Sequence, residues 1–300
     1  MSRTVIVTGA AGRLGRVVVE VLGQQGWRVL GTDVRQAEEG PAVHVLDLLD
    51  TQAVHDWIAS SDAEAIVHLG NHPAPRPSLG EVPVYNQNVA MNMNVFQAAH
   101  ELGIVKIAFA STIQVISSQM LRDRGMPLPV EVAYLPMDGD TPPRPGNSYG
   151  LSKFASEQML DYFARLGPLQ AVSLRFPALP RDAAWLGKRR QGRPSPDKIG
   201  QGFAWLTRRD AARLIAAILD SDLPGHRVYL PAAAVPSTGQ PVAELLQQHY
   251  PDVPRRTDPV ERLVDTSRIE ADTGWTPLEG NDPAELHVQD DDADEREKSR

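Results

Sequence analysis

Tyr149 and Lys153 stand four residues apart in the stretch Tyr-Gly-Leu-Ser-Lys. On a helix their side chains share one face, one turn apart. A free phenol has a pKa of about 10, too high for an acid/base group at neutral pH. An ammonium about 5 Å away, at an effective dielectric of about 20, favours the phenolate by roughly 3 kcal/mol, or about 2 pKa units. The pair could then exchange a proton with an alcohol or a carbonyl. The alternative interpretation is that Tyr149 and Lys153 only form part of a solvated helix face.

A glycine-rich turn near the N-terminus suggests what this pair could act with. The β-branched run 4–8 predicts a buried strand, and the stretch Gly-Ala-Ala-Gly-Arg-Leu-Gly follows at residues 9–15. Apolar residues then recur at helical spacing until Gly26 ends the helix. Such glycines let the backbone approach a pyrophosphate, which the helix N-terminus binds. An ordinary strand–helix turn is the alternative.

Asp33 follows the next predicted strand, 28–32, eighteen residues after Gly15. A carboxylate there can accept hydrogen bonds from both ribose hydroxyls of NAD, and it repels a 2′-phosphate. Together with the glycine turn it predicts a dinucleotide site that favours NAD. Arg35 leaves NADP as the less favoured alternative.

Strands and helices alternate through the first half of the chain. Further strands are predicted at 43–46, 65–70, 106–110 and 169–175, and helices at 54–58, 84–102 and 149–166. This order predicts an α/β fold with a Rossmann-like, doubly wound parallel sheet and right-handed crossovers. His68 lies inside an apolar strand, which favours a hydrogen-bonded core histidine over a catalytic one.

Several positions near predicted strand ends could meet a ligand. Thr112 lies just after the predicted strand 106–110. At the tip of this strand its hydroxyl can hydrogen-bond a substrate oxygen. The proline-rich stretch 71–77 is a candidate substrate loop, and the long connection 117–148 is typical of a lid or a disordered segment. Asn88, near the start of its helix, faces the active site or only bridges backbone groups.

Composition narrows the function classes. A formal net charge of −8 argues against nucleic acid or an anionic membrane as the main partner. There is no cysteine, and the eight histidines show no ligand spacing, so no disulfide and no metal site are predicted. We find no signal peptide and no apolar run of about 20 residues, which predicts a soluble cytoplasmic protein.

Two charged stretches have open roles. Residues 187–193 form a basic stretch that could meet a carboxylate or phosphate of a substrate, or form a solvated loop. Residues 281–300 are polar and acidic, which predicts a disordered tail.

Taken together, the motifs resemble a known family. The turn TGAAGRLG, Asp33, Asp47-Leu48, Thr112, YGLSK and Leu174-Arg175-Phe176 occur in the order and approximate spacing of the extended short-chain dehydrogenases/reductases, in the NAD-dependent epimerase/dehydratase group. Stretches at 207–212 and 265–277 resemble later signatures of the group, so the resemblance covers about residues 3–280.

The resemblance implies roles for individual residues. Tyr149 would be the acid/base, Lys153 would lower its pKa and hold the nicotinamide ribose, and Thr112 would orient the substrate oxygen. The positions implied for cofactor binding are Gly9, Gly12, Arg13, Leu14, Gly15, Asp33, Asp47, Leu48, Leu69, Gly70, Asn88, Tyr149, Lys153 and Pro177.

The resemblance also implies an organisation. Residues 1–177 with about 207–230 would form the NAD-binding domain. About 178–206 with 231–280 would form a smaller C-terminal substrate-binding lobe. The helices 84–102 and 149–166, which pair across the dimer in the family, predict a homodimer.

Three functions follow, in order of preference. The first is an NAD-dependent oxidoreductase acting on a secondary alcohol or carbonyl of a small polar substrate, such as a sugar or sugar acid. The second is a nucleotide-sugar epimerase or dehydratase with tightly bound NAD. Ala178 stands where such members often have asparagine, and Val115-Ile116-Ser117 replaces their Val-Tyr-Gly, so this reading is weaker. The third is a non-catalytic NAD(H)-binding regulator.

Overall fold

The computed structural model describes residues 3–36, 42–73, 79–117, 132–180 and 196–278. Seven parallel strands form one sheet in the order β3-β2-β1-β4-β5-β6-β7. Their bounds are β1 Thr4–Thr8, β2 Arg28–Asp33, β3 His44–Val45, β4 Ala65–His68, β5 Lys106–Thr112, β6 Gln170–Phe176 and β7 Gly225–Tyr229. The predicted Rossmann-like α/β fold is confirmed.

The central strands β1 and β4 are buried along their whole length because helices cover both faces of the sheet. Every residue of β1 and β4 is buried. At the edge, both residues of β3 are exposed, and the strand is shorter than the predicted 43–46. The sequence prediction also missed β7.

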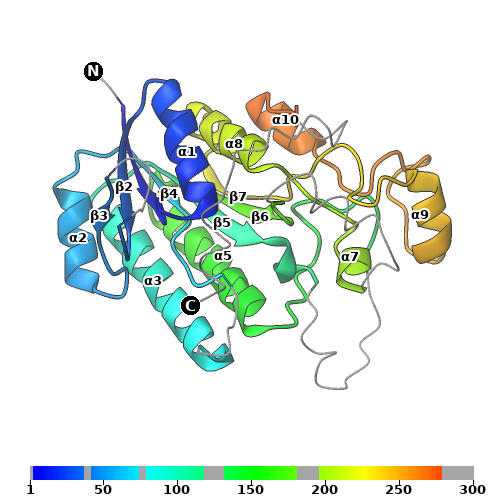
Figure 1. The fold of residues 1–300 in the computed structure, drawn as a ribbon, viewed down its shortest axis with the longest axis horizontal. Coiled ribbons are helices and arrows are strands. Elements are labelled where there is room, and N and C mark those ends of the chain that lie inside the picture. The colour runs from blue at the N-terminus through cyan, green and yellow to red at the C-terminus, as the bar shows by residue number, and fades with distance from the viewer. Residues whose placement is uncertain (1–2, 37–41, 74–78, 118–131, 181–195, 279–300) are drawn as a thin grey trace.

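Two layers of helices sandwich the sheet (Figure 1). Helices α1 (Arg13–Gln24) and α8 (Arg208–Asp220) pack together on one face. On the other face lie α2 (Thr51–Ala59), α3 (Glu81–Glu101) and α5 (Ser148–Leu166), with α3 packed along α5. The two layers bury separate apolar clusters, one on each side of the sheet.

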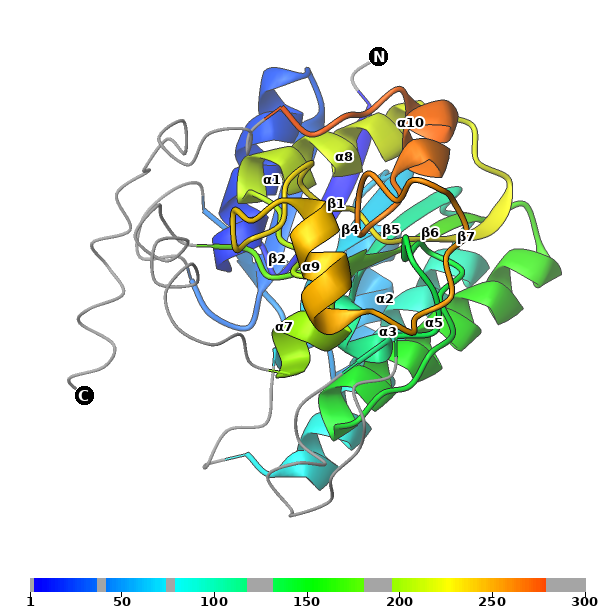
Figure 2. The same ribbon diagram turned by 90° about the vertical axis from the view of Figure 1, so that its right-hand side faces the viewer.

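A third apolar cluster lies beyond the ends of the central strands. Around it lie α7 (Pro196–Gly200), α9 (Val242–His249) and the short 3-10 helix η1 (Ile113–Val115); Figure 2 places α9 in front of the sheet. Helix α10 (Ser267–Thr273) instead packs on α8, and its Ile269 belongs to the core of the α1–α8 face. The division into two domains stays a prediction.

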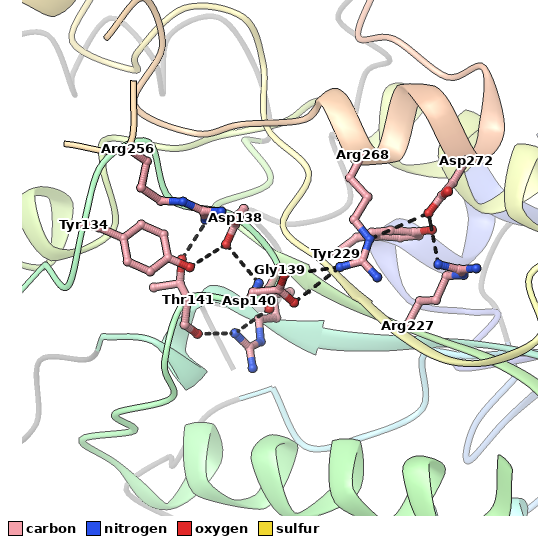
Figure 3. A network of polar contacts seen from close by, with 11 residues as sticks. Tyr134, Asp138, Gly139, Asp140, Thr141, Arg227, Tyr229, Arg256, Arg268 and Asp272 are labelled. Atoms are coloured by element: carbon pink, nitrogen blue, oxygen red, sulfur yellow. Dashed lines mark hydrogen bonds and ion pairs between the residues drawn. The ribbon is translucent and has the colours of Figure 1, made fainter. Parts of the chain in front are cut away.

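The connection leading to α5 is tied to the C-terminal region. Its backbone forms bridges at Leu135 to Arg255 and at Met137 to Val264. Figure 3 shows the polar side chains that join these segments, among them the Asp138 carboxylate between Tyr134 and Arg256. The described part of the long predicted connection, 132–147, is therefore ordered against the third cluster.

Some predicted features lie outside the described residues. These are the basic stretch 187–193, the tail 281–300, residues 74–77 of the loop 71–77 and residues 118–131 of the connection 117–148. Within the described residues, no helix is long and apolar enough to cross a membrane.

Candidate active site

The turn after β1 leaves no room for a side chain at Gly9 or at Gly15. Gly9 has φ +69°, the left-handed region that favours glycine, and a Cβ there would lie 2.9 Å from the Gly70 nitrogen. A Cβ at Gly15 would lie 2.1 Å from the Gly9 carbonyl oxygen. Helix α1 therefore begins tightly against the turn.

Helix α1 begins directly after the glycine turn. Gly12 is its N-cap without a side-chain cap, Arg13 and Leu14 are its first residues, and its first turn contains no acidic side chain. Uncapped N–H groups at a helix start bind anions well. This geometry fits a pyrophosphate.

Asp33 ends β2 beside the same turn. Its Oδ2 accepts a hydrogen bond from the Ala11 N–H at 3.1 Å. The structure thus places Asp33, the residue predicted to bind the adenosine ribose, beside the turn predicted to bind the pyrophosphate.

Leu48 and Gly70 form the neighbouring wall of this region. A Cβ at Gly70 would lie 2.8 Å from the Leu48 Cδ1, and the Leu69 and Gly70 N–H groups donate to the Thr8 hydroxyl. Asp47 accepts from the Leu49 N–H at 2.9 Å, which shapes the turn after β3. These predicted cofactor positions therefore lie at the carboxyl-terminal ends of the strands.

Thr112 and Tyr149 meet where β5 ends and α5 begins. The N-cap Asn147 accepts from the Gly150 N–H at 2.6 Å and donates to the Gln114 side chain at 2.8 Å. A Cβ at Gly150 would lie 2.5 Å from the Gln114 carbonyl oxygen. The start of α5 is thereby held against η1, and the Thr112 hydroxyl lies beside the Tyr149 phenol.

Burial raises the pKa of Tyr149 to about 12, against the lowering effect of the neighbouring Thr112 hydroxyl. The expected lowering of this pKa by Lys153 is therefore not seen in this structure. The reason is that desolvation of the phenolate outweighs the favourable contacts. The Lys153 Nζ lies 5.8 Å from the centre of the Tyr149 ring.

Lys153 is itself buried among neutral groups. Its Nζ donates to Asn71 Oδ1 at 2.5 Å and to the Ala110 carbonyl at 2.7 Å, and lies 4.6 Å from the centre of the Phe109 ring. Burial lowers the pKa of Lys153 to about 7, against the raising effect of Glu157. Near neutral pH this side chain can therefore be charged or neutral.

Asn88 bridges two elements. Its Oδ1 accepts from the His72 N–H at 2.8 Å, and its Nδ2 donates to the His72 carbonyl at 3.1 Å and the Ser152 hydroxyl at 3.2 Å. The amide thus holds the loop after β4 against α5, and a direct contact of Asn88 with cofactor stays a prediction. Pro177, also predicted for the cofactor, is buried directly after β6.

His68 is the hydrogen-bonded core histidine that the sequence favoured. It is fully buried, with Nδ1 2.7 Å from the Thr8 hydroxyl and Nε2 2.7 Å from Asn92 Oδ1. Burial lowers the pKa of His68 to about 3, so the ring is neutral.

Sequence reasoning placed Asn71 only within the candidate substrate loop 71–77, and it missed Asn92 and Ser156. A signal was present, because apolar helices carry matched polar pairs four residues apart, Asn88 with Asn92 and Ser152 with Ser156. In the structure both pairs face each other across the α3–α5 contact.

Comparisons with known proteins agree with this architecture. Residues 5–180 match the NAD dependent epimerase/dehydratase family. A structure of a short-chain dehydrogenase/reductase superfamily protein from Agrobacterium tumefaciens with bound NAD superposes with a TM-score of 0.69 at 21% identity, covering 99% of this chain and 98% of that one. The fold is therefore that of the short-chain dehydrogenases/reductases.

Proteins of similar sequence include dehydrogenases of sugars and sugar acids. An NAD-dependent glucose-6-phosphate dehydrogenase of Haloferax volcanii is 29% identical over 76% of this chain and 85% of its own length. A uronate dehydrogenase of Pseudomonas syringae pv. tomato is 30% identical over 74% of this chain and 72% of its own length. The chain belongs to the NAD-dependent epimerase/dehydratase family.

Proposed function

We propose that the protein is an NAD-dependent oxidoreductase that acts on a secondary alcohol or carbonyl of a sugar or sugar acid. One observation carries the proposal. The Tyr149 phenol lies beside the Thr112 hydroxyl, one helical turn from the buried Lys153, at the carboxyl ends of the central strands. Ligands bind at this end of such sheets.

The cofactor and the substrate class rest on further support. The uncapped start of α1 and the Asp33 carboxylate suit a dinucleotide without a 2′-phosphate. Relatives named as dehydrogenases of glucose 6-phosphate and uronate share about 30% of the aligned residues. Ala178 lacks the amide that nucleotide-sugar members often place there, which favours a simple sugar over a nucleotide sugar.

The chain's own residues would divide the work as follows. The first turn of α1 and Asp33 would hold the two ends of the adenosine diphosphate part, and Lys153 the nicotinamide ribose. Thr112 would orient the substrate oxygen, while Tyr149 takes or returns its proton. NAD, when bound, supplies the acceptor and donor of the hydride.

The test is a turnover assay with matched tyrosine variants. Hexoses, hexose 6-phosphates and uronic acids are offered with NAD, and NADH absorbance is followed. Tyr149→Phe should lose about 10²- to 10⁴-fold in turnover while still binding NAD. Tyr162→Phe, half-exposed on the same helix, should keep full activity. Near-normal turnover in Tyr149→Phe would remove this phenol from the mechanism.

Denaturing the purified protein separates this proposal from an epimerase or dehydratase cycle. A dehydrogenase exchanges its cofactor each turnover, so little nicotinamide dinucleotide should be released. A near-stoichiometric yield would indicate a retained, recycled cofactor and would contradict the proposal.

We also propose a homodimer through α3 and α5. Large apolar side chains are exposed on both helices at positions eleven residues apart, or about three turns, so each pair lies on one stripe. These are Val82 and Met93 on α3, and Leu151 and Tyr162 on α5. Sedimentation should show a dimer at micromolar concentration that Tyr162→Glu weakens. A monomer in the unaltered protein would rule the proposal out.

A further inference from the structure

A buried chain of polar side chains runs from the end of β1 to the lysine of α5. It passes from Thr8 through His68 and Asn92 to Asn71, whose Oδ1 accepts from Lys153 Nζ. The sheet, α3 and the loop after β4 all contribute to it. Nothing in the proposed reaction explains why this chain ends on the lysine.

The hydrogen positions at the far end follow from the contacts. Thr8 Oγ1 accepts the N–H groups of Leu69 and Gly70, both at 3.1 Å. Its own proton is then donated to His68 Nδ1. Because the ring is neutral, the remaining proton is on Nε2, which donates to Asn92 Oδ1.

This tautomer sets the orientation of the two amides. Asn92 Oδ1 also accepts from Asn71 Nδ2 at 2.7 Å, while Asn92 Nδ2 donates to the Ser156 hydroxyl at 2.5 Å. With its Nδ2 engaged in this way, Asn71 turns its Oδ1 toward Lys153. An amide flip at Asn71 would break both contacts at once.

Within the described part of the chain, no charged group near Lys153 is a direct counter-ion. Glu157, one turn further along α5, is bonded by Ser111 of β5 and by Arg175 of β6. His68 of β4 is neutral, and Tyr149 holds its proton at neutral pH. The direct partners of Nζ in the structure are two neutral oxygens, those of Asn71 and Ala110.

We propose that Asn71 is a positioning residue that stabilises the charged form of Lys153 and holds it beside Tyr149, with its amide oriented by Thr8, His68 and Asn92. The inference rests on the proposed function for its catalytic meaning. Its effect on Lys153 is a property of the folded chain and can be measured without any substrate.

The primary test titrates Lys153 by NMR of lysine labelled with ¹³C at Cε. The chain contains five lysines, and Lys153→Arg identifies the signal of interest. Asn71→Ala should lower the pKa of Lys153 by about one unit, because it removes a hydrogen bond to a charged group. Asn71→Asp should raise this pKa, since it places a carboxylate beside the ammonium.

Opposite shifts would support the proposal. An unchanged pKa in Asn71→Ala, or shifts of the same sign in both variants, would overturn it. Asn71→Ser, too short to reach Nζ, repeats the first arm should the alanine variant not fold. Asn86→Ala on α3 is the matched control and should leave the titration unaltered.

A second test uses turnover on the substrate found above. Asn71→Ala should reduce kcat about tenfold with little change in the sugar KM, and move the alkaline limb of the pH–rate profile, where Lys153 loses its proton, down by about one unit. An unmoved limb would overturn the catalytic part of the proposal. If the unaltered enzyme turns over no sugar, the proposed function fails, while the NMR titration still decides the role of Asn71.

Discussion

Two charged side chains one turn apart on α5 are buried in opposite ways. Glu157 receives a two-pronged contact from Arg175, at 3.1 and 2.9 Å, and a third hydrogen bond from Ser111 at 2.6 Å. Among the described residues, the hydrogen-bond partners of Lys153 are neutral oxygens. One charge is in direct contact with an opposite charge, whereas the other contacts neutral groups and is stabilised by Glu157 without direct contact.

The difference teaches where chemistry can occur. A buried ion pair stabilises both of its charges, because removing either charge leaves the other without compensation. A charge held by dipoles is close to losing its proton, and burial lowers the pKa of Lys153 to about 7. The Glu157 cluster stabilises the fold, whereas the Lys153 cluster holds a charge whose pKa is lowered by burial.

Breaking the compensated pair should have the largest effect. Arg175→Met leaves Glu157 buried without its counter-ion and removes the donors to the Gly139 and Thr141 carbonyls. We expect the free energy of unfolding to fall by about 3–5 kcal/mol, measured by urea denaturation. A loss below about 1 kcal/mol would show that the two clusters do not differ as described.

Breaking the neutral cluster at its far end should cost less. Thr8→Val removes the acceptor of two N–H groups and the donor to His68. The expected loss is about 1–3 kcal/mol in the free energy of unfolding. Thr4→Val, buried on the same strand, is the matched control. Equal losses in both variants would mean that the Thr8 contacts add nothing specific.

The free energy of unfolding should depend on pH through the buried charge of Lys153. The pKa of Lys153 is about 7 when folded and 10.5 when unfolded. Between these values the unfolded chain binds one more proton, so stability rises with pH by at most about 1.4 kcal/mol per unit. Above about pH 10 the raised pKa of Tyr149 acts in the opposite direction.

Lys153→Met tests this slope. The variant should be flatter than the unaltered protein between about pH 7 and 10 in urea denaturation. Identical slopes in the two proteins would contradict a lowered pKa for Lys153.

An exposed ion pair on the same helix should have the smallest effect. Arg165 contacts Asp161 at 3.1 Å, but its side chain is 70% exposed. Arg165→Met should change the free energy of unfolding by no more than about 0.5 kcal/mol, because water and salt screen the pair. A loss comparable to that of Arg175→Met would mean that burial does not separate the two pairs.

The same contrast marks what the sequence could predict. Periodicity and the glycine turn predicted the parallel sheet, because these signals are local. The spacing of Tyr149 and Lys153 placed both on one helix, as observed. The raised pKa of Tyr149 could not be predicted, since it depends on desolvation by elements distant in sequence.

The partners of Lys153 were out of reach for a related reason. Asn71 is 82 residues away and lies in a loop, where neither helical nor strand periodicity constrains a side chain. Similarly, β7 is short and half-buried, so its apolar pattern is weak. The pairing of residues 132–147 with the C-terminal region has no local signature at all.

That pairing has a consequence for protein synthesis. Leu135 is in register with Arg255, 120 residues later, and this segment leads directly into α5. At about 5–20 residues per second, a ribosome needs roughly 6 to 24 seconds to make the missing partner. The strands up to β6 can assemble in that interval, while the approach to α5 waits for its support. A nascent chain would therefore possess the glycine turn after β1 well before the start of α5, with the proposed acid/base Tyr149, is fully supported.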